Sequence, residues 1–160
     1  MSNTIYMTRE RLQELEIEVQ ELKSKGRKEI AQKIADARSH GDLSENADYD
    51  AAKHEQELLE IRIAKIESIL GKAQVVDPKD FPDDKKIYIL SKVKLRNKKN
   101  NAEVEYLMVS AEEADFEQNK LSVTSPLGKV LMGKTIGDTV QTKVPAGTIE
   151  YEILDVNRSI

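Results

Sequence analysis

The sequence has 160 residues, of which 34% are charged and only 4% aromatic, and its formal net charge is −4. It contains no cysteine, which excludes disulfides, cysteine-ligated zinc sites and thiol chemistry. A net acidic chain also argues against a general nucleic-acid-binding protein, which normally has a basic surface. No apolar run approaches the roughly 18 residues of a membrane span, so we expect a soluble cytoplasmic protein.

Residues 8 to about 40 have the periodicity of a long helix. Apolar side chains follow the three-four spacing of a coiled-coil seam at Leu12, Leu15, Val19 and Leu22. The seam resumes at Ile30, and the extra step between the two stretches is expected to unwind the coil locally without ending the helix.

A second stretch repeats the same spacing. Its seam positions are Tyr49, Ala52, Gln56, Leu59, Ile63, Ile66 and Leu70. Because so few residues separate the two stretches, they are predicted to fold back as an antiparallel hairpin, with Gly71 just past the end of the second helix.

The remainder of the chain predicts strands and minor helices. Five strands are expected, at Ile87–Arg96, Glu103–Val109, Leu121–Val123, Thr139–Val144 and Thr148–Val156. Short helices are expected at Glu112–Gln118 and Ser125–Met132, the latter with Ser125 as N-cap and Pro126 in the first turn. Strands without βαβ alternation predict an α+β fold. The expected domains are a hairpin at 1–76 with its tip at 41–46, a linker at 77–86 and a C-terminal domain at 87–160.

Two acidic residues, Asp42 and Glu45, lie between the predicted helices. Three positions apart, their carboxylates share one side of a helical turn and are hard ligands suited to Mg²⁺. Two carboxylates are too few to hold the ion tightly, so the pair suits a site that another molecule completes. The same spacing also fits a capping box with Asp42 as the N-cap, and spacing alone favours this alternative.

Several segments resemble the GreA/GreB family, and the likeness runs through essentially the whole chain in order. They are Met7-Thr8-Arg9, the run from Arg38 to Tyr49 with Ala51-Ala52-Lys53, Ala114-Asp115-Phe116, and the run from Ser122 to Gly128. The resemblance implies a coiled-coil hairpin followed by an FKBP-like α+β domain. The small number of basic residues on the hairpin favours GreA over GreB.

The resemblance implies an accessory factor of transcription elongation rather than an enzyme. Its hairpin would enter the secondary channel of bacterial RNA polymerase. There Asp42 and Glu45 would help to hold the polymerase's second Mg²⁺, while the polymerase cleaves backtracked nascent RNA. By position, Arg38 and Lys53 match a basic patch that contacts the RNA 3′ end. The alternative is that each is an ordinary solvated charge, or pairs with a neighbouring aspartate.

The resemblance also implies residues that grip the rim of the secondary channel. They are Asp115, Ser122, Ser125, Pro126 and Leu127. The alternative here is that Ser125 and Pro126 merely start a helix. We expect a monomer with no membrane contact and no stably bound cofactor of its own.

Three other functions compete with this hypothesis. A coiled-coil adaptor with a simply capped tip would not need the two acids. A self-contained metal nuclease would need more ligands than one Asp and one Glu. An inhibitory paralogue that plugs the channel is disfavoured because no extra acids lie between Asp42 and Glu45.

Overall fold

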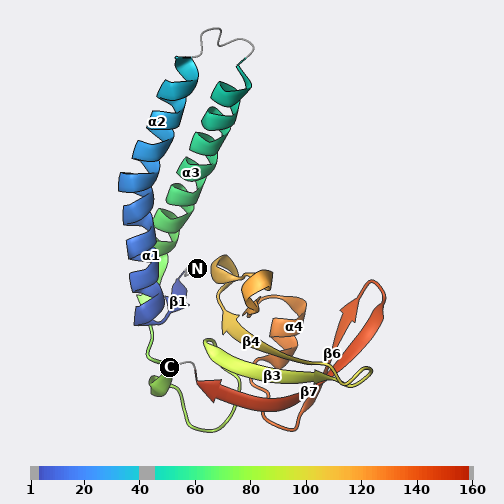
Figure 1. The fold of residues 1–160 in the computed structure, drawn as a ribbon. Coiled ribbons are helices and arrows are strands. Elements are labelled where there is room, and N and C mark those ends of the chain that lie inside the picture. Colours follow the sequence, from blue (N-terminus) through green and yellow to red (C-terminus); the bar gives the residue numbers. More distant parts are fainter. Residues whose placement is uncertain (1–3, 40–45, 159–160) are drawn as a thin grey trace. The chain divides into compact units, whose positions relative to one another are not determined.

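The computed structural model describes residues 4–39 and 46–158, and its contacts divide the chain into two units. One unit comprises Glu10–Ala73, and the other comprises Met1–Arg9 together with Gln74–Ile160. A helical hairpin and a mostly antiparallel sheet confirm the predicted α+β fold (Figure 1).

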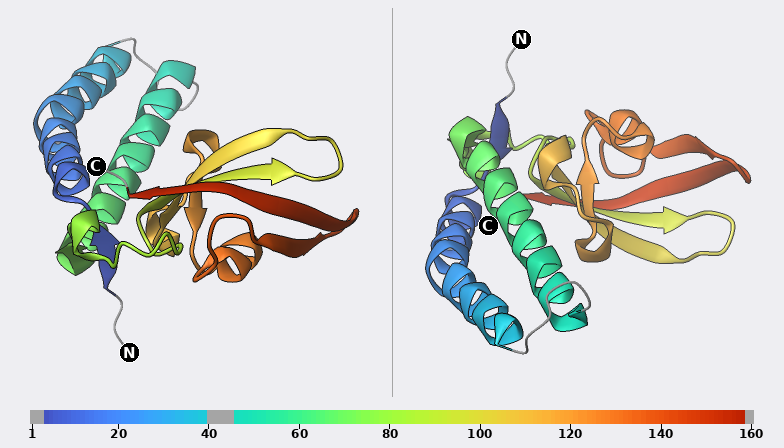
Figure 2. Two further views of the ribbon diagram at one scale, coloured as in Figure 1. Left: turned by 90° about the horizontal axis from the view of Figure 1, so that it is seen from below. Right: turned by 90° about the horizontal axis from the view of Figure 1, so that it is seen from above.

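The hairpin pairs one interrupted helix with one continuous helix. Its elements are α1 (Arg9–Glu21), the π-helical segment η1 (Leu22–Gly26), α2 (Arg27–Arg38) and α3 (Ala47–Lys72). In Figures 1 and 2, α2 lies beside the first part of α3, where Lys33 pairs with Glu55 and Arg27 pairs with Glu60. The predicted end of the second helix at Gly71 is wrong, because α3 continues to Lys72 and its C-cap is Ala73.

The predicted seam is the buried line between the helices. Leu15, Val19, Ile34 and Ala37 are buried on the first arm, as are Ala52, Ile63 and Ile66 on the second. The last predicted position is wrong, because Ile69 is buried where Leu70 was expected, and Leu70 is only half-buried. Because the seam repeats along both helices, burial of these side chains fixes which faces meet.

The irregular step in the first seam coincides with η1. A π turn closes with i→i+5 bonds and so holds one more residue than an α turn. Leu22 and Ile30 are eight residues apart, and the wider turn keeps both half-buried along the seam. The prediction of a locally unwound but continuous helix is confirmed. Gly26 closes the segment, where an added Cβ would lie 3.2 Å from Leu59 Cδ1.

Ion pairs between the helices run along both flanks of the seam. Arg62 donates to Glu18 at 2.8 and 3.0 Å, and Arg27 donates to Glu60 at 3.0 and 2.8 Å. The hydrogen bond from Arg62 lowers the pKa of the Glu18 carboxyl. Exposed pairs contribute about 0.2–1 kcal/mol each, so they favour the correct register more than they stabilise the hairpin.

The second unit is built on a five-stranded sheet. Its strands are β3 (Ser91–Asn97), β4 (Glu103–Val109), β5 (Lys120–Ser122), β6 (Thr139–Val144) and β7 (Gly147–Arg158), in the order β5-β4-β3-β7-β6. All pairings are antiparallel except that of β4 with β5. One face packs with α4 (Pro126–Leu131) around a core of Ile87, Val93, Leu95, Met108, Leu131, Val140, Ile153 and Val156.

Three short elements of this structure are absent from the sequence-based expectations. Strands β1 (Ile5–Met7) and β2 (Ala73–Val75) form a two-stranded sheet, and a 3₁₀ turn, η3, covers Pro78–Asp80. The backbone N–H of Tyr6 also donates to Ser110 Oγ at 3.2 Å.

Two further predictions were wrong in detail. Residues 87–90 do not extend β3, because Leu90 adopts a left-handed φ of 69° and Ile87 bonds to the backbone of Lys134. The helix expected at Glu112–Gln118 is instead two 3₁₀ turns, η4 (Ala111–Glu113) and η5 (Phe116–Gln118), because the Asp115 side chain begins a new turn.

The segment before the sheet is held by Arg158, at the end of β7. Its guanidinium donates to the carbonyl oxygens of Pro82 at 2.8 Å and Lys86 at 3.1 Å, and lies 5.0 Å from the centre of the Tyr88 ring. The Tyr88 hydroxyl donates to Asp84 and thereby lowers the pKa of that carboxyl. Much of the segment that the sequence marks as a linker is therefore tied to the sheet.

The π segment predicts that the two arms of the hairpin differ in how well they tolerate the deletion of one residue. Deleting Ser24 brings Leu22 and Ile30 to seven residues apart, a heptad spacing that an uninterrupted α-helix can satisfy. We expect the melting temperature of the helical circular dichroism signal to change by less than about 3 °C.

Deleting the exposed Glu57 from α3 is the matched control. No π turn interrupts α3, so the deletion rotates one half of its seam away from the partner helix. The melting temperature should fall by about 10 °C or more. Equal effects of the two deletions would contradict this role of η1.

Candidate functional site

The hairpin ends where α2 stops at Arg38 and α3 begins at Ala47. The predicted metal-directing residues, Asp42 and Glu45, lie in the interval 40–45, outside the described residues. The candidate site is therefore defined by the side chains on either side of that interval.

Asn46 is the N-cap of α3. It has an extended backbone, with φ −89° and ψ 98°, and its Oδ1 accepts the N–H of Tyr49 at 3.1 Å. The alternative in which Asp42 caps this helix is wrong, because Asn46 occupies the cap. Asp48 and Asp50 follow in the first turn, where negative charge is favourable next to the helix N-terminus.

The same side chain reaches across to the first arm. Asn46 Nδ2 donates to the carbonyl oxygen of Ala37, in the last turn of α2, at 2.5 Å. One amide thus supplies an N–H to the end of one helix and an acceptor to the start of the other. Its bond to Ala37 depends on the pairing of the two helices, so the sequence alone does not predict it.

A second contact between the arms lies beside Asn46. The Arg38 guanidinium lies 5.9 Å from the centre of the Tyr49 ring, and Tyr49 is half-buried at its seam position. Such cation–π contacts contribute about 0.5–1 kcal/mol at exposed sites. The contact still leaves Arg38 exposed at the end of its helix.

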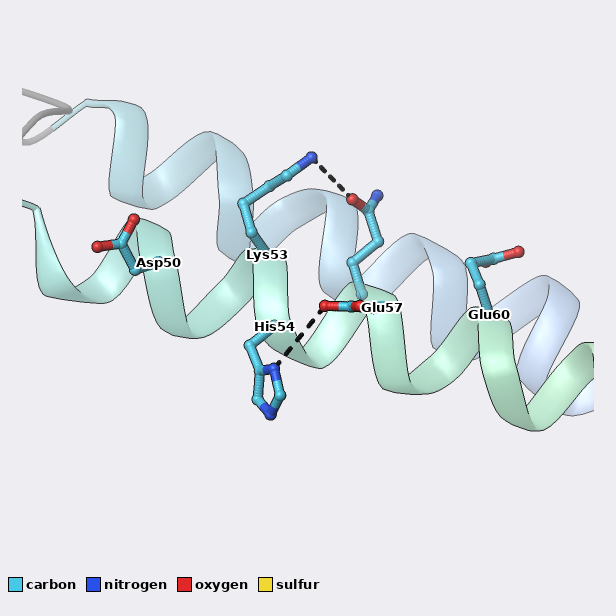
Figure 3. A pocket seen from close by; sticks show the side chains of 6 residues that line it. Asp50, Lys53, His54, Glu57 and Glu60 are labelled. Carbon is cyan, nitrogen blue, oxygen red and sulfur yellow. Dashed lines mark hydrogen bonds and ion pairs between the residues drawn. The ribbon is translucent and has the colours of Figure 1, made fainter.

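Lys53 lies on α3, the opposite arm from Arg38. Its Nζ donates to Gln56 Oε1 at 3.0 Å, and it borders a shallow hollow lined by Asp50, His54, Gln56, Glu57 and Glu60 (Figure 3). The Lys53 ammonium is exposed, and its partner is an uncharged amide. This hydrogen bond therefore does not neutralise the positive charge of Lys53. The basic patch of Arg38 and Lys53 stays a prediction.

The residues predicted to grip a partner surround one edge of the sheet. Asp115 Oδ1 accepts the N–H of Glu117 at 3.0 Å, and its backbone pairs with Lys120. Ser125 caps α4 by accepting the N–H of Gly128 at 3.0 Å, and donates to the carbonyl oxygen of Ser122 at 2.6 Å. The predicted helix start at Ser125 and Pro126 is confirmed.

Gly128 allows this turn to close. A Cβ at Gly128 would lie 2.0 Å from the Ser122 carbonyl oxygen and 2.9 Å from Ser125 Oγ, far inside contact distance. The run from Ser122 to Gly128 is therefore held in one conformation by its own hydrogen bonds and by the absence of a side chain.

Phe116 was not among the predicted binding residues. Its side chain is 86% exposed, in η5 directly after Asp115. An aromatic side chain exposed to this degree is typical of an interaction site rather than of a folded core. Only its exposure distinguishes it from a core residue. The sequence does not show whether a residue at an irregular turn is exposed or buried.

Within 4–39 and 46–158, no three His, Cys, Asp or Glu side chains are grouped so that they could hold a metal ion. Over the same ranges, no helix has the length and apolar character needed to cross a membrane.

Comparison with known proteins identifies the family. A model of the N-terminal domain of GreA/GreB transcription elongation factors matches residues 5–75, and a model of their C-terminal domain matches residues 82–158. The chain belongs to the GreA/GreB family of transcription elongation factors. Its sequence is 50% identical to transcription elongation factor GreA of Chlorobaculum parvum and 51% identical to that of Chlorobaculum tepidum, in each case over 98% of both chains.

The likeness to solved structures is looser. The transcription factor Gfh1 aligns with 98% of this chain and 99% of its own, at 23% identity and a TM-score of 0.48. The family assignment therefore rests on the sequence models and on the GreA relatives, and it confirms the predicted resemblance to GreA.

The turn around Gly128 gives a prediction about this GreA/GreB chain. Gly128→Ala should lower the free energy of unfolding of the sheet unit by about 2–4 kcal/mol, because the new methyl group meets a backbone oxygen. Urea unfolding followed by tyrosine fluorescence measures it.

Gly71→Ala is the control substitution. Nothing lies within 4 Å of a Cβ built at Gly71, which is inside α3, so alanine there should stabilise the helix by about 0.5–1 kcal/mol. An unchanged unfolding midpoint for Gly128→Ala would contradict the close approach.

Proposed function

We propose that this chain is a transcript-cleavage factor of bacterial RNA polymerase. The hairpin enters the polymerase secondary channel and brings Asp42 and Glu45 to the active centre of a backtracked complex. The polymerase then hydrolyses its own nascent RNA near the 3′ end. The observation that carries the proposal is the family assignment over both units, in a chain whose hairpin ends beside two acids.

The proposed chemistry follows from the donor set. One Asp and one Glu supply hard oxygen ligands suited to Mg²⁺, but too few to bind it without help from the polymerase and the RNA phosphate. In two-metal hydrolysis, the second ion stabilises the leaving oxygen of the phosphodiester. The role of Asp42 and Glu45 is to complete that coordination, so the factor needs no metal site of its own.

The exposed charges near the hairpin end fit the same role. Arg38 and Lys53 lie on opposite arms, so they could contact the RNA backbone from both sides of the tip. Local positive charge on a chain of net charge −4 suits contact with a short stretch of RNA rather than general binding.

The sheet edge supplies the proposed grip on the channel rim. The turn from Ser122 to Leu127 is held by its own hydrogen bonds, and Asp115 and Phe116 adjoin it through the backbone pairing with Lys120. A preformed turn beside one exposed aromatic residue is the arrangement expected of an interface with a central anchor.

The tip acids are tested with a purified, backtracked elongation complex that carries end-labelled RNA. Asp42→Asn and Glu45→Gln should each reduce the saturated rate of stimulated 3′-fragment release by about 100-fold or more, because each removes a charged ligand. The factor concentration that gives half the saturated rate should change little.

Asp50→Asn is the matched control, because it removes an exposed carboxylate from the first turn of α3 and should leave the rate unchanged. Failure of the wild-type protein to stimulate cleavage would overturn the proposal. Inhibition of intrinsic cleavage by the wild type would instead favour an inhibitory paralogue.

The grip is tested separately. Phe116→Ala should weaken binding to RNA polymerase by about tenfold or more, since a buried aromatic anchor typically contributes at least 1–2 kcal/mol. Binding is measured by competition with a fluorescently labelled wild-type factor.

Ile136→Ala is the control for the grip, because Ile136 is a large apolar residue of the same unit that is 42% exposed. It should bind like the wild type. Equal affinities of the Phe116→Ala and wild-type proteins would exclude Phe116 from the interface.

A further inference from the structure

Asn46 is the residue through which the two arms are joined at the end of the hairpin. It lies nine positions after Ala37, accepts from the start of α3 and donates to the end of α2. Both bonds are made to backbone atoms, so they fix the end of α2 and the start of α3 rather than the positions of flexible side chains.

Only the asparagine side chain has the chemistry for both bonds at this length. An aspartate keeps an oxygen for the Tyr49 N–H but, when ionised, has no hydrogen to offer the Ala37 carbonyl. A serine also caps a helix well, but its hydroxyl is too short to replace the amide N–H across the hairpin. The cap and the link between the arms can therefore be separated by substitution.

The neighbouring contacts restrain the same place. Tyr49, whose N–H Asn46 accepts, holds its ring beneath the Arg38 guanidinium, so the last turn of α2 and the first turn of α3 meet at two points. Ala37 is buried and Asn46 is half-buried, and partial exclusion of water strengthens a hydrogen bond between them.

We propose that Asn46 is a positioning residue for stimulated RNA cleavage, acting through its bond to Ala37. The inference rests on the proposed function, because the residues to be positioned are Asp42 and Glu45. Asp42 and Glu45 belong to the segment that the bond closes, and Glu45 is adjacent to Asn46 in the sequence. An error of about 1 Å in the position of a reacting group can reduce a rate about 100-fold, so the link matters more to the rate than to folding.

Asn46→Ser and Asn46→Asp test the inference, because both keep the helix cap and lose the link. The rate of 3′-fragment release is measured as a function of factor concentration in a backtracked complex. We expect the saturated rate to fall about tenfold or more for both variants, with half-saturation within about twofold of the wild type. Agreement between the two variants separates loss of the link from the added charge of aspartate.

Asn100→Ser and Asn100→Asp are the controls. The side chain of Asn100 accepts the N–H of Ala102 at 2.9 Å in an exposed turn between β3 and β4, a local role that both replacements can retain. Both controls should match the wild type in rate and half-saturation. Helical circular dichroism should be the same for all four variants.

Three results would overturn the inference. The first is a wild-type saturated rate for Asn46→Ser. The second is a loss that appears only in half-saturation, which would indicate weaker binding. The third is a loss of helical signal that accounts for the lower rate. Failure of the proposed function is distinguishable, because the wild type would then give no stimulation and Asp42→Asn would match it.

Discussion

Everything at the end of the hairpin depends on the register between its two arms. The apolar seam fixes which faces of the helices meet, and ion pairs such as Arg62–Glu18 and Arg27–Glu60 penalise a shift along the axis. Only in this register does the Ala37 carbonyl come within reach of the Asn46 amide. A helix of this kind is stabilised mainly by burial of its apolar face along its length. A small polar contact at its end can therefore set local geometry while contributing little to the stability of the fold.

The π segment adjusts that register from within the first arm. Three successive four-residue steps, through Leu22, Gly26, Ile30 and Ile34, would carry an ordinary helix away from its partner. The wider turn absorbs the excess, and the absence of a side chain at Gly26 leaves room for Leu59. Hence α2 and α1, on either side of η1, present the same face of the first arm to α3.

Periodicity carried most of the sequence-based prediction. The sequence predicted the two seams, strands β4 and β6 and the Ser125 cap, because alternation and capping chemistry are local properties of the chain.

The predictions failed where a partner distant in the sequence decided the outcome. Leu90 adopts a left-handed conformation in the segment where Ile87 pairs with Lys134. The N-cap of α3 is Asn46, which also bonds to Ala37 on the first arm, and not Asp42. Phe116 was missed since its exposure follows from how the 3₁₀ turns are placed on the sheet. The roles of Asp42 and Glu45 came from resemblance to the family and stay predictions.

The proposed function requires that the hairpin end reaches the RNA in the polymerase active centre. The chain has no cysteine, so a single cysteine at Ser39, exposed after α2, can carry an iron chelate that generates hydroxyl radicals locally. In a backtracked elongation complex, we expect a chelate at Ser39→Cys to cut the 3′-proximal RNA. A chelate at Ser68→Cys, near the other end of α3, should not cut it. Uncut RNA with the Ser39→Cys chelate, in complexes that retain the factor, would show that the hairpin end does not reach the RNA.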